Sequence, residues 1–256
     1  MSQDSTQPNN HNTVHAGRVS RMCAEVQLCA SLQIEDWLLR LHKGIGPLLL
    51  AEVGDGSIRV FDISRGSLAT ENVIKLQAVP EGLKDGFRKI TSANWVPDNP
   101  NLITSCDSEG LIQFWDLRTC SAGIAWNATR ENRAGVAFNG QVCALGDCRG
   151  SILLWDPRVS KQIALLEEIH TDEISQITFH DVYRTQLLSA AADGLVQRFD
   201  LNAPSEDDCL QSVWNTEQTA RRIGFFGSNS EFLYSLTEVE SVLLYDMTCV
   251  SCLVLL

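Results

Sequence analysis

The sequence predicts an all-β protein built from a repeated sheet, and three observations support this fold class. First, one pattern occurs five times: a turn, an apolar run, and an aromatic residue followed by Asp. Second, the closing aspartates recur at intervals of 40 to 54 residues, a period typical of the blades of a β-propeller. Third, the runs are rich in β-branched and aromatic residues and show no helical period. The closing aspartates are Asp62, Asp116, Asp156, Asp200 and Asp246.

The apolar run that closes each copy is predicted to be the third strand of a blade. Successive side chains of a strand point to opposite faces of its sheet. In the second copy one face carries Ile112 and Phe114, and in every copy the other face ends in an aromatic residue. Because both faces are largely apolar, each sheet is expected to lie between two neighbouring sheets, as in a propeller. The aromatic residues are Phe61, Trp115, Trp155, Phe199 and Tyr245.

A second apolar run precedes each third strand, and a tight turn such as Asp193-Gly194 joins the two runs as a hairpin. The second strands are predicted at 47–53, 101–106, 141–146, 186–191 and 231–236. Runs farther upstream are predicted to be innermost strands, at 90–95, 134–139, 174–179 and 221–226. The outer strand of each blade is harder to recognise from the sequence. The sequence thus predicts five recognisable blades.

The two ends of the chain lie outside these repeats. Residues 1–22 are polar and are predicted to be a disordered tail, which leaves 23–256 as a partial propeller. The last segment, 248–256, is interpreted as the outer strand of a sixth blade. Two arrangements follow. In an incomplete, open arc the molecule would self-associate through an open blade edge. In a five-bladed closure the last segment would pair with residues 22–30.

Composition and charge narrow the function classes. The net charge is −12 and no window clusters Lys and Arg, which argues against nucleic acid as a direct partner. No signal peptide and no apolar stretch of 18 residues is present, which predicts a soluble protein of the cytosol or nucleus and no membrane partner. The nine cysteines are predicted to be reduced. Cys249 and Cys252 form a lone CxxC, so no metal and no other cofactor is predicted.

Residues 169–201, IHTDEISQITFHDVYRTQLLSAAADGLVQRFDL, resemble a repeat of the WD-repeat family. Together with the segments FWDLR and LLWDPR, they are most similar to the group of WD repeat-containing protein 89. The resemblance implies a buried hydrogen-bond chain of His170, Ser189 and Asp193, in which the Asp accepts from the imidazole and the imidazole meets the hydroxyl. Phe199 stands where the family has a Trp that donates. The other copies show no matching His, and two of them have Glu109 or Arg149 at the turn position.

Motifs for catalysis are not found in the sequence. It contains no Walker-type loop, no HExxH and no GxSxG. His170 and His180 lie near acidic residues, a pairing that can serve acid–base catalysis. The resemblance gives His170 a structural role, and His180 is expected at a strand end near the surface. We therefore predict no catalytic residues and no enzymatic activity.

The family resemblance implies a non-enzymatic scaffold for protein–protein interactions, with binding residues on the loops of a rigid frame. Asp116, Arg118, Asp156 and Arg158 resemble the doubled Asp-x-Arg box of WD proteins that are substrate receptors of cullin-type ubiquitin ligases. This implies a ubiquitin-ligase adaptor as partner, held by bidentate arginines. Each Arg could instead pair with the Asp of its own blade. A module that binds chromatin through basic histone tails is a second alternative, because the chain is acidic.

Overall fold

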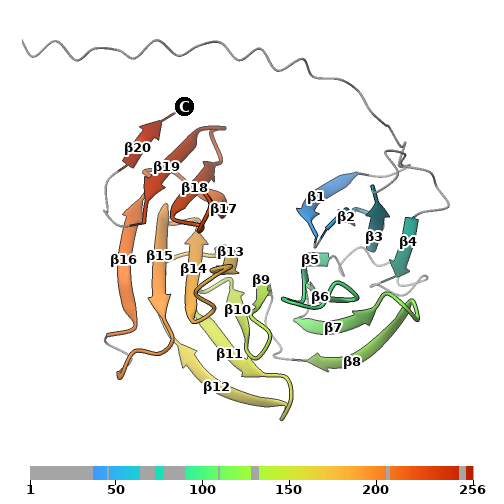
Figure 1. Cartoon of the computed structure of the whole chain (residues 1–256). Helices are drawn as coiled ribbons and strands as arrows, with labels where there is room; N and C mark the ends of the chain where they lie inside the picture. The colour runs from blue at the N-terminus through green and yellow to red at the C-terminus, as the bar shows by residue number, and fades with distance from the viewer. Residues whose placement is uncertain are drawn as a thin grey trace, which may run out of the picture.

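The computed structural model describes residues 37–44, 46–63, 73–77, 90–108, 110–127, 133–205, 208–247 and 252–255. These residues form twenty strands in five four-stranded antiparallel sheets. Figure 1 shows the sheets in sequence order around a common centre, as the blades of a propeller. The prediction of an all-β propeller with five blades is confirmed. Residues 1–22, predicted to be a disordered tail, lie outside the described residues, as do residues 22–30.

Every blade has the same meander order, in which each strand pairs with the next along the chain. Blade one contains β1 (Leu38–Lys43), β2 (Leu48–Val53), β3 (Ser57–Asp62) and β4 (Val73–Gln77). Blade two contains β5 (Ile90–Trp95), β6 (Leu102–Asp107), β7 (Leu111–Asp116) and β8 (Ser121–Asn127). Blade three contains β9 (Arg133–Phe138), β10 (Cys143–Asp147), β11 (Ile152–Asp156) and β12 (Lys161–Leu166). Blade four contains β13 (Ile174–Phe179), β14 (Gln186–Ala191), β15 (Leu195–Asp200) and β16 (Leu210–Asn215). Blade five contains β17 (Ala220–Phe226), β18 (Phe232–Thr237), β19 (Val242–Asp246) and β20 (Cys252–Leu255).

The hydrophobic core lies between the blades. It consists of four clusters, and each cluster joins side chains from two successive blades. Between blades one and two, for example, Ile58 of β3 and Trp115 of β7 belong to one buried cluster. Between blades four and five, Trp214 of β16 and Tyr245 of β19 do the same, with ring centroids 6.2 Å apart. A blade therefore buries its apolar faces against its neighbours, which is why both faces of each third strand are apolar in the sequence.

The interpretation of the C-terminal segment as part of a sixth blade is wrong. Residues 252–255 form β20, the outer strand of blade five, and β20 pairs with β19 in antiparallel register, with Leu243 opposite Leu255. The physical reason is that β19 would otherwise expose an edge of unpaired backbone groups, and the nearest following strand pairs with that edge. Each blade therefore has its own outer strand, although the outer strands were hard to recognise in the sequence.

The five blades form an arc around inner strands β1, β5, β9, β13 and β17 (Figure 1). Within this arc β5 packs against β9, β9 against β13, and β13 against β17. No pair of described strands from blades one and five packs as closely as these pairs do. The described residues also include no helix that is long and apolar enough to cross a membrane.

Candidate partner-binding face and the network that supports it

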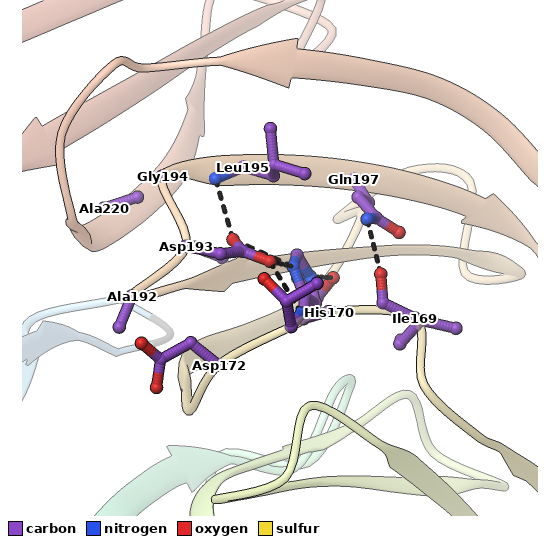
Figure 2. Close-up of polar contacts among 12 residues, drawn as sticks. Ile169, His170, Asp172, Ala192, Asp193, Gly194, Leu195, Gln197 and Ala220 are labelled. Carbon is purple, nitrogen blue, oxygen red and sulfur yellow. Dashed lines mark hydrogen bonds and ion pairs between the residues drawn. The ribbon is translucent and has the colours of Figure 1, made fainter.

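His170, Ser189 and Asp193 come together in blade four. Figure 2 shows the side chains of His170 and Asp193 pointing toward one another. His170 Nδ1 lies 3.0 Å from Asp193 Oδ2, and His170 Nε2 lies 2.7 Å from Ser189 Oγ. His170 is 2% exposed and Ser189 is fully buried. The His lies in the connection before β13, the Ser on β14, and the Asp in the turn between β14 and β15. The three side chains thus form one chain of hydrogen bonds between elements far apart in sequence.

The partners determine which nitrogen of His170 carries the proton. Because the Asp193 carboxylate is only an acceptor, Nδ1–H donates to it, and Nε2 accepts from the Ser189 hydroxyl. Burial lowers the pKa of His170 below its ordinary value, although the Asp193 carboxylate acts in the opposite direction. The imidazole is therefore neutral near pH 7 and both of its nitrogens are satisfied.

The same network holds the loop between blades three and four. Asp193 Oδ2 also accepts from Thr171 N at 3.0 Å, and Gln197 Nε2 donates to Ile169 O at 2.7 Å (Figure 2). His170 N donates in turn to Gly150 O in the hairpin of blade three, at 3.1 Å. A Cβ atom on Gly150 would lie 2.1 Å from His170 O, and Gly150 has a φ of +81°. Only glycine fits there, because the Gly150 backbone lies directly against the His170 backbone. This contact joins the hairpin of blade three to the loop that carries His170.

One backbone N–H in the hairpin between the second and third strands is capped in all five blades. The acceptor is a side-chain oxygen from the residue two or four positions earlier, so the same turn is stabilised by differently placed residues. The donor and acceptor residues are Ser57 and Asp55 (2.8 Å), Leu111 and Asp107 (2.9 Å), Ser151 and Asp147 (2.7 Å), Leu195 and Asp193 (2.9 Å), and Ser241 and Thr237 (3.2 Å).

Sequence reasoning missed Asp107 and Asp147 because it looked for an Asp directly before the turn glycine. In blades two and three the Asp lies at the end of the second strand instead, three residues before Gly110 or Gly150. The pattern Asp-x-x-Gly, which occurs in both copies, is the signal that could have found them. Arg149 is exposed in the turn and leaves the capping to Asp147.

The aromatic residue that ends each third strand has different partners in different blades. Trp115 Nε1 donates to Ser105 Oγ at 2.9 Å in a buried hydrogen bond. Trp155 Nε1 is buried without a hydrogen-bond partner among the described residues, because Leu145 occupies the position that Ser105 has in blade two. Ser235 Oγ in blade five is also buried, and no group in the described part of the chain bonds to it.

The two Asp-x-Arg turns have the same geometry. Arg118 Nη2 lies 2.6 Å from Asp116 Oδ2, and Arg158 Nη2 lies 2.7 Å from Asp156 Oδ2. In both turns the Arg Nε donates to the other carboxylate oxygen at 3.0 Å, so each guanidinium is bidentate to the Asp of its own blade. The Arg118 hydrogen bonds lower the pKa of Asp116 to about 2. The Arg118 and Arg158 side chains are 70% and 63% exposed.

A cavity of about 600 Å³ opens at the ends of the inner strands on the same side as these turns. The side is the same because β5 and β7 run parallel, so that Trp95 and Asp116 end at one edge of blade two. Its wall includes Trp95, Phe138 and Phe179, which lie near the ends of β5, β9 and β13. Pro97 and Pro100 line it as well. The cavity thus combines aromatic walls with turns from three blades.

Charged groups of both signs surround this cavity. Lys43, Arg184, Asp98 and Asp181 all line it. Arg184 Nη2 of blade four lies 2.5 Å from Asp98 Oδ2 of blade two. Asn139 Nδ2 of blade three donates to Arg184 O at 2.9 Å. These bonds link the turns of three blades, so the rim of the cavity is held as one unit.

His180 differs from its expected surface position, because it is 3% exposed. Its Nδ1 accepts the N–H groups of Val182 and Tyr183 at 3.1 and 3.0 Å, and its Nε2–H donates to Ser230 O of blade five at 3.1 Å. Burial lowers the pKa of His180. It is buried because the β13–β14 turn packs against blade five, with the His180 and Phe225 ring centroids 4.5 Å apart.

Known proteins resemble this chain in sequence and in structure. WD repeat-containing protein 89 homolog from Dictyostelium discoideum is 29% identical over 221 residues, which cover 84% of this chain and 56% of that protein. WD repeat-containing protein GTS1 from Arabidopsis thaliana is 32% identical over 176 residues, which cover 67% of this chain and 45% of that protein. The chain thus spans about half the length of these curated relatives.

The structural comparison gives the same fold. A chain in the crystal structure of the mitotic checkpoint complex superposes with a TM-score of 0.64 at 14% identity, covering 88% of this chain and 72% of that chain. No family model matches the sequence. The five repeated sheets, the buried networks between them and the similarity to curated WD-repeat proteins place this chain in the WD-repeat β-propeller family.

Proposed function

We propose that this chain is a non-catalytic scaffold that binds partner proteins on the face where the inner strands β5, β9 and β13 end. The observation that supports this proposal is the 600 Å³ cavity with aromatic and proline walls and a charged rim. Aromatic pockets with a few polar groups are typical recognition sites for side chains of a partner. An extended segment of the partner would insert an apolar side chain between Trp95, Phe138 and Phe179 and pair its charges with the rim.

The two buried histidines of blade four support a scaffold over an enzyme. Both ring nitrogens of His170 and of His180 are engaged in hydrogen bonds with protein groups. A general base needs a nitrogen within reach of a substrate proton. We therefore assign both histidines to the structural framework.

Thr178→Arg tests this proposal, because Thr178 lines the cavity and a long charged side chain would fill it. Gln162→Arg introduces the same charge on the exposed outer strand of blade three and is the matched control. Tagged wild type and both variants are expressed in cells, and copurifying proteins are quantified by mass spectrometry. We expect partners that are retained by Gln162→Arg and lost from Thr178→Arg. Identical partner sets for all three proteins, with circular dichroism confirming the fold, would contradict the proposal.

A second candidate function is that of a substrate receptor of a cullin-type ubiquitin ligase. It is favoured by the equivalent geometry and exposure of Arg118 and Arg158 in two successive blades. The bidentate pairing with Asp116 and Asp156 uses Nε and one Nη2 hydrogen of each Arg, so the other guanidinium hydrogens are left to contact an adaptor. Replacement of both arginines by Ala should abolish copurification of the adaptor, whereas Arg149→Ala on the other edge of blade three should not. Retained adaptor in the double variant rules this function out.

Binding to basic histone tails is the remaining alternative, and the net charge of −12 favours it electrostatically. A histone-tail peptide should then bind with an affinity that falls as salt is raised, because the attraction between opposite charges is screened. Fluorescence anisotropy measures this, and a peptide of the same composition in scrambled order is the control. Equal binding of both peptides would assign the attraction to net charge alone.

A further inference from the structure

We propose that a second cavity, at the centre of the propeller between β1 and β17, binds a small, multiply charged oxyanion of the phosphate class. This cavity has a volume of about 250 Å³ and is lined by side chains of blades one, two, four and five. Arg40, Arg222 and Tyr234 would contact the anion. The cavity shares His42 and Asn94 with the partner-binding cavity, but neither Arg40 nor Arg222 lines that cavity, and the proposed anion does not require a bound partner protein.

Arg222 is the first reason for this assignment. Arg222 lines the cavity, and its one side-chain hydrogen bond to described residues is from Nη1 to the neighbouring Arg221 O, at 2.9 Å. No carboxylate of the described residues lies within ion-pair distance of it. Burial and the positive charge of Arg40 lower the pKa of Arg222 more than the attraction of Glu52 raises it, so its positive charge is only partly compensated. An anion would supply the missing partner.

Arg40 on β1 is the second cationic group, and its partner Glu52 is already occupied. Arg40 Nε lies 3.6 Å from Glu52 Oε2, beyond hydrogen-bond distance, and Arg40 makes no hydrogen bond within the described part of the chain. Glu52 is 1% exposed, and its Oε1 accepts from Ala93 N at 2.8 Å and contacts His42 Nε2 at 2.9 Å. The carboxylate is thus held by Ala93 N and His42, while the Arg40 guanidinium keeps free donors.

The charge around this cavity is opposite to that of the whole protein. Two guanidiniums, those of Arg40 and Arg222, lie near a single carboxylate, Glu52, in a chain whose net charge is −12. Arginine forks match the tetrahedral oxygens of phosphate by bidentate hydrogen bonds. Both guanidiniums belong to half-buried residues, so such hydrogen bonds are less screened there than at a fully exposed arginine. The local excess of positive charge therefore indicates an anion.

The remaining polar groups and the size of the cavity define the class of anion. Tyr234 lines the cavity, and its hydroxyl makes no hydrogen bond to described residues. Asn94 and Gln176 also line the cavity, but their amides are bonded to the backbone of neighbouring blades. A volume of 250 Å³ is below the usual range for drug-sized ligands, of about 300–1,000 Å³. A phosphate or pyrophosphate fits this description better than a nucleotide.

Isothermal titration calorimetry of the full chain tests the proposal. The probes are inorganic phosphate and pyrophosphate, with potassium chloride keeping the ionic strength constant. We expect saturable binding at one site per chain and a rise in the unfolding temperature at saturation. Arg222→Gln should weaken binding by about tenfold or more, because it removes a charge-assisted contact. Tighter binding of pyrophosphate than of phosphate would assign the site to polyphosphates, and equal binding to a single phosphate group.

Arg221→Gln is the matched control, because Arg221 is the adjacent arginine on β17, lies outside this cavity and pairs with Glu238 at 3.5 Å. It should bind the probes as the wild type does. Tyr234→Phe keeps the ring and removes only the hydroxyl, so it should fold normally and weaken binding by a smaller factor, about three- to tenfold. Absence of saturable binding to both probes overturns the proposal. Equal affinities of the wild type, Arg222→Gln and Tyr234→Phe also overturn it.

Discussion

Blade three and blade four have the same strand order but fill equivalent buried positions with opposite chemistry. In blade four Ser189 is part of a hydrogen-bond chain, and the aromatic residue of the third strand is the apolar Phe199. In blade three the position of Ser189 is taken by Leu145, and the aromatic residue is Trp155, whose indole N–H has no partner within the described ranges. Blade four therefore has the polar hydrogen-bond chain but no Trp at the end of its third strand, whereas blade three has the Trp but no equivalent chain.

This difference shows that the propeller does not require the complete network in any single blade. Apolar packing between blades forms the core at all four junctions, including the one between blades three and four. The polar chain of His170 adds a fixed position for the loop that joins the two blades. Burial of an unpaired polar group costs free energy, so an incomplete network lowers the stability of its blade.

The largest effect is expected where the two blades meet, at Gly150. Gly150→Ala would place a Cβ atom 2.1 Å from His170 O, at a φ of +81° that disfavours any side chain. We expect it to lower the free energy of unfolding by about 4 kcal/mol or more. Gly140→Ala is the control, because its φ is +99° but the nearest atom is 4.0 Å away, so only about 1–3 kcal/mol of backbone strain applies. Urea unfolding measures both, and equal losses would show that the His170 contact contributes nothing.

A smaller effect is expected at two equivalent serines. Ser189→Ala would leave His170 Nε2 buried without a partner, which should cost about 1–3 kcal/mol of unfolding free energy. Ser235→Ala in blade five removes a hydroxyl that is already unpaired, so stability should be unchanged or rise by up to about 1 kcal/mol. Chemical denaturation of the two variants is the measurement. The comparison fails if Ser235→Ala is the more destabilising of the two.

The tryptophans near the ends of two third strands, Trp115 and Trp155, allow a similar comparison between a paired and an unpaired buried polar group. Trp115→Phe removes the hydrogen bond to Ser105 and leaves that hydroxyl unpaired, whereas Trp155→Phe removes only an unpaired N–H. Both substitutions replace an indole by a phenyl ring. We therefore expect Trp115→Phe to be the more destabilising by about 1 kcal/mol, measured as the difference between their unfolding free energies. A difference of zero or of opposite sign would show that the Trp115 hydrogen bond adds no net stability.

The sequence predicted the second and third strands of every blade, because their apolar runs and turns repeat at a regular spacing. It did not predict the outer strands, which need apolar character on one side only and, like β12, carry exposed polar residues. The tail 252–255 was recognised as an outer strand but assigned to a sixth blade, because the residues of a strand do not specify which neighbouring strand it pairs with. Within the site, the turn glycines could be predicted from the sequence. The capping residues Asp107 and Asp147 could not, because the equivalent backbone N–H of the hairpin can be capped by a residue two or four positions earlier. The pairing of Arg118 with Asp116 was one of two open readings, since spacing alone does not say which partner an exposed Arg chooses.

The smallest expected effect is a dependence of stability on pH that arises in blade four. Burial lowers the pKa values of His170 and His180 in the folded state, and blade three, residues 133–166, contains no histidine. Between the lowered pKa and the unfolded value of about 6.5, the unfolded chain binds more protons than the folded one. Stability contributed by these neutral rings is therefore fully present above pH 7 and is lost as the pH falls below about 6.5, with a slope of at most about 1.4 kcal/mol per pH unit for each histidine.

Urea unfolding at a series of pH values from 8 to 5.5 measures this dependence. His170→Gln and His180→Gln should each be less stable than the wild type at pH 8, because each loses part of a buried hydrogen-bond set, but each should show a smaller loss between pH 7 and pH 5.5. The change in slope separates proton binding from packing, because a purely structural role would lower the stability equally at all pH values. A wild-type stability that stays constant or rises on acidification through this window would mean that the two rings are not held neutral, and that the polar chain of blade four differs from blade three in packing alone.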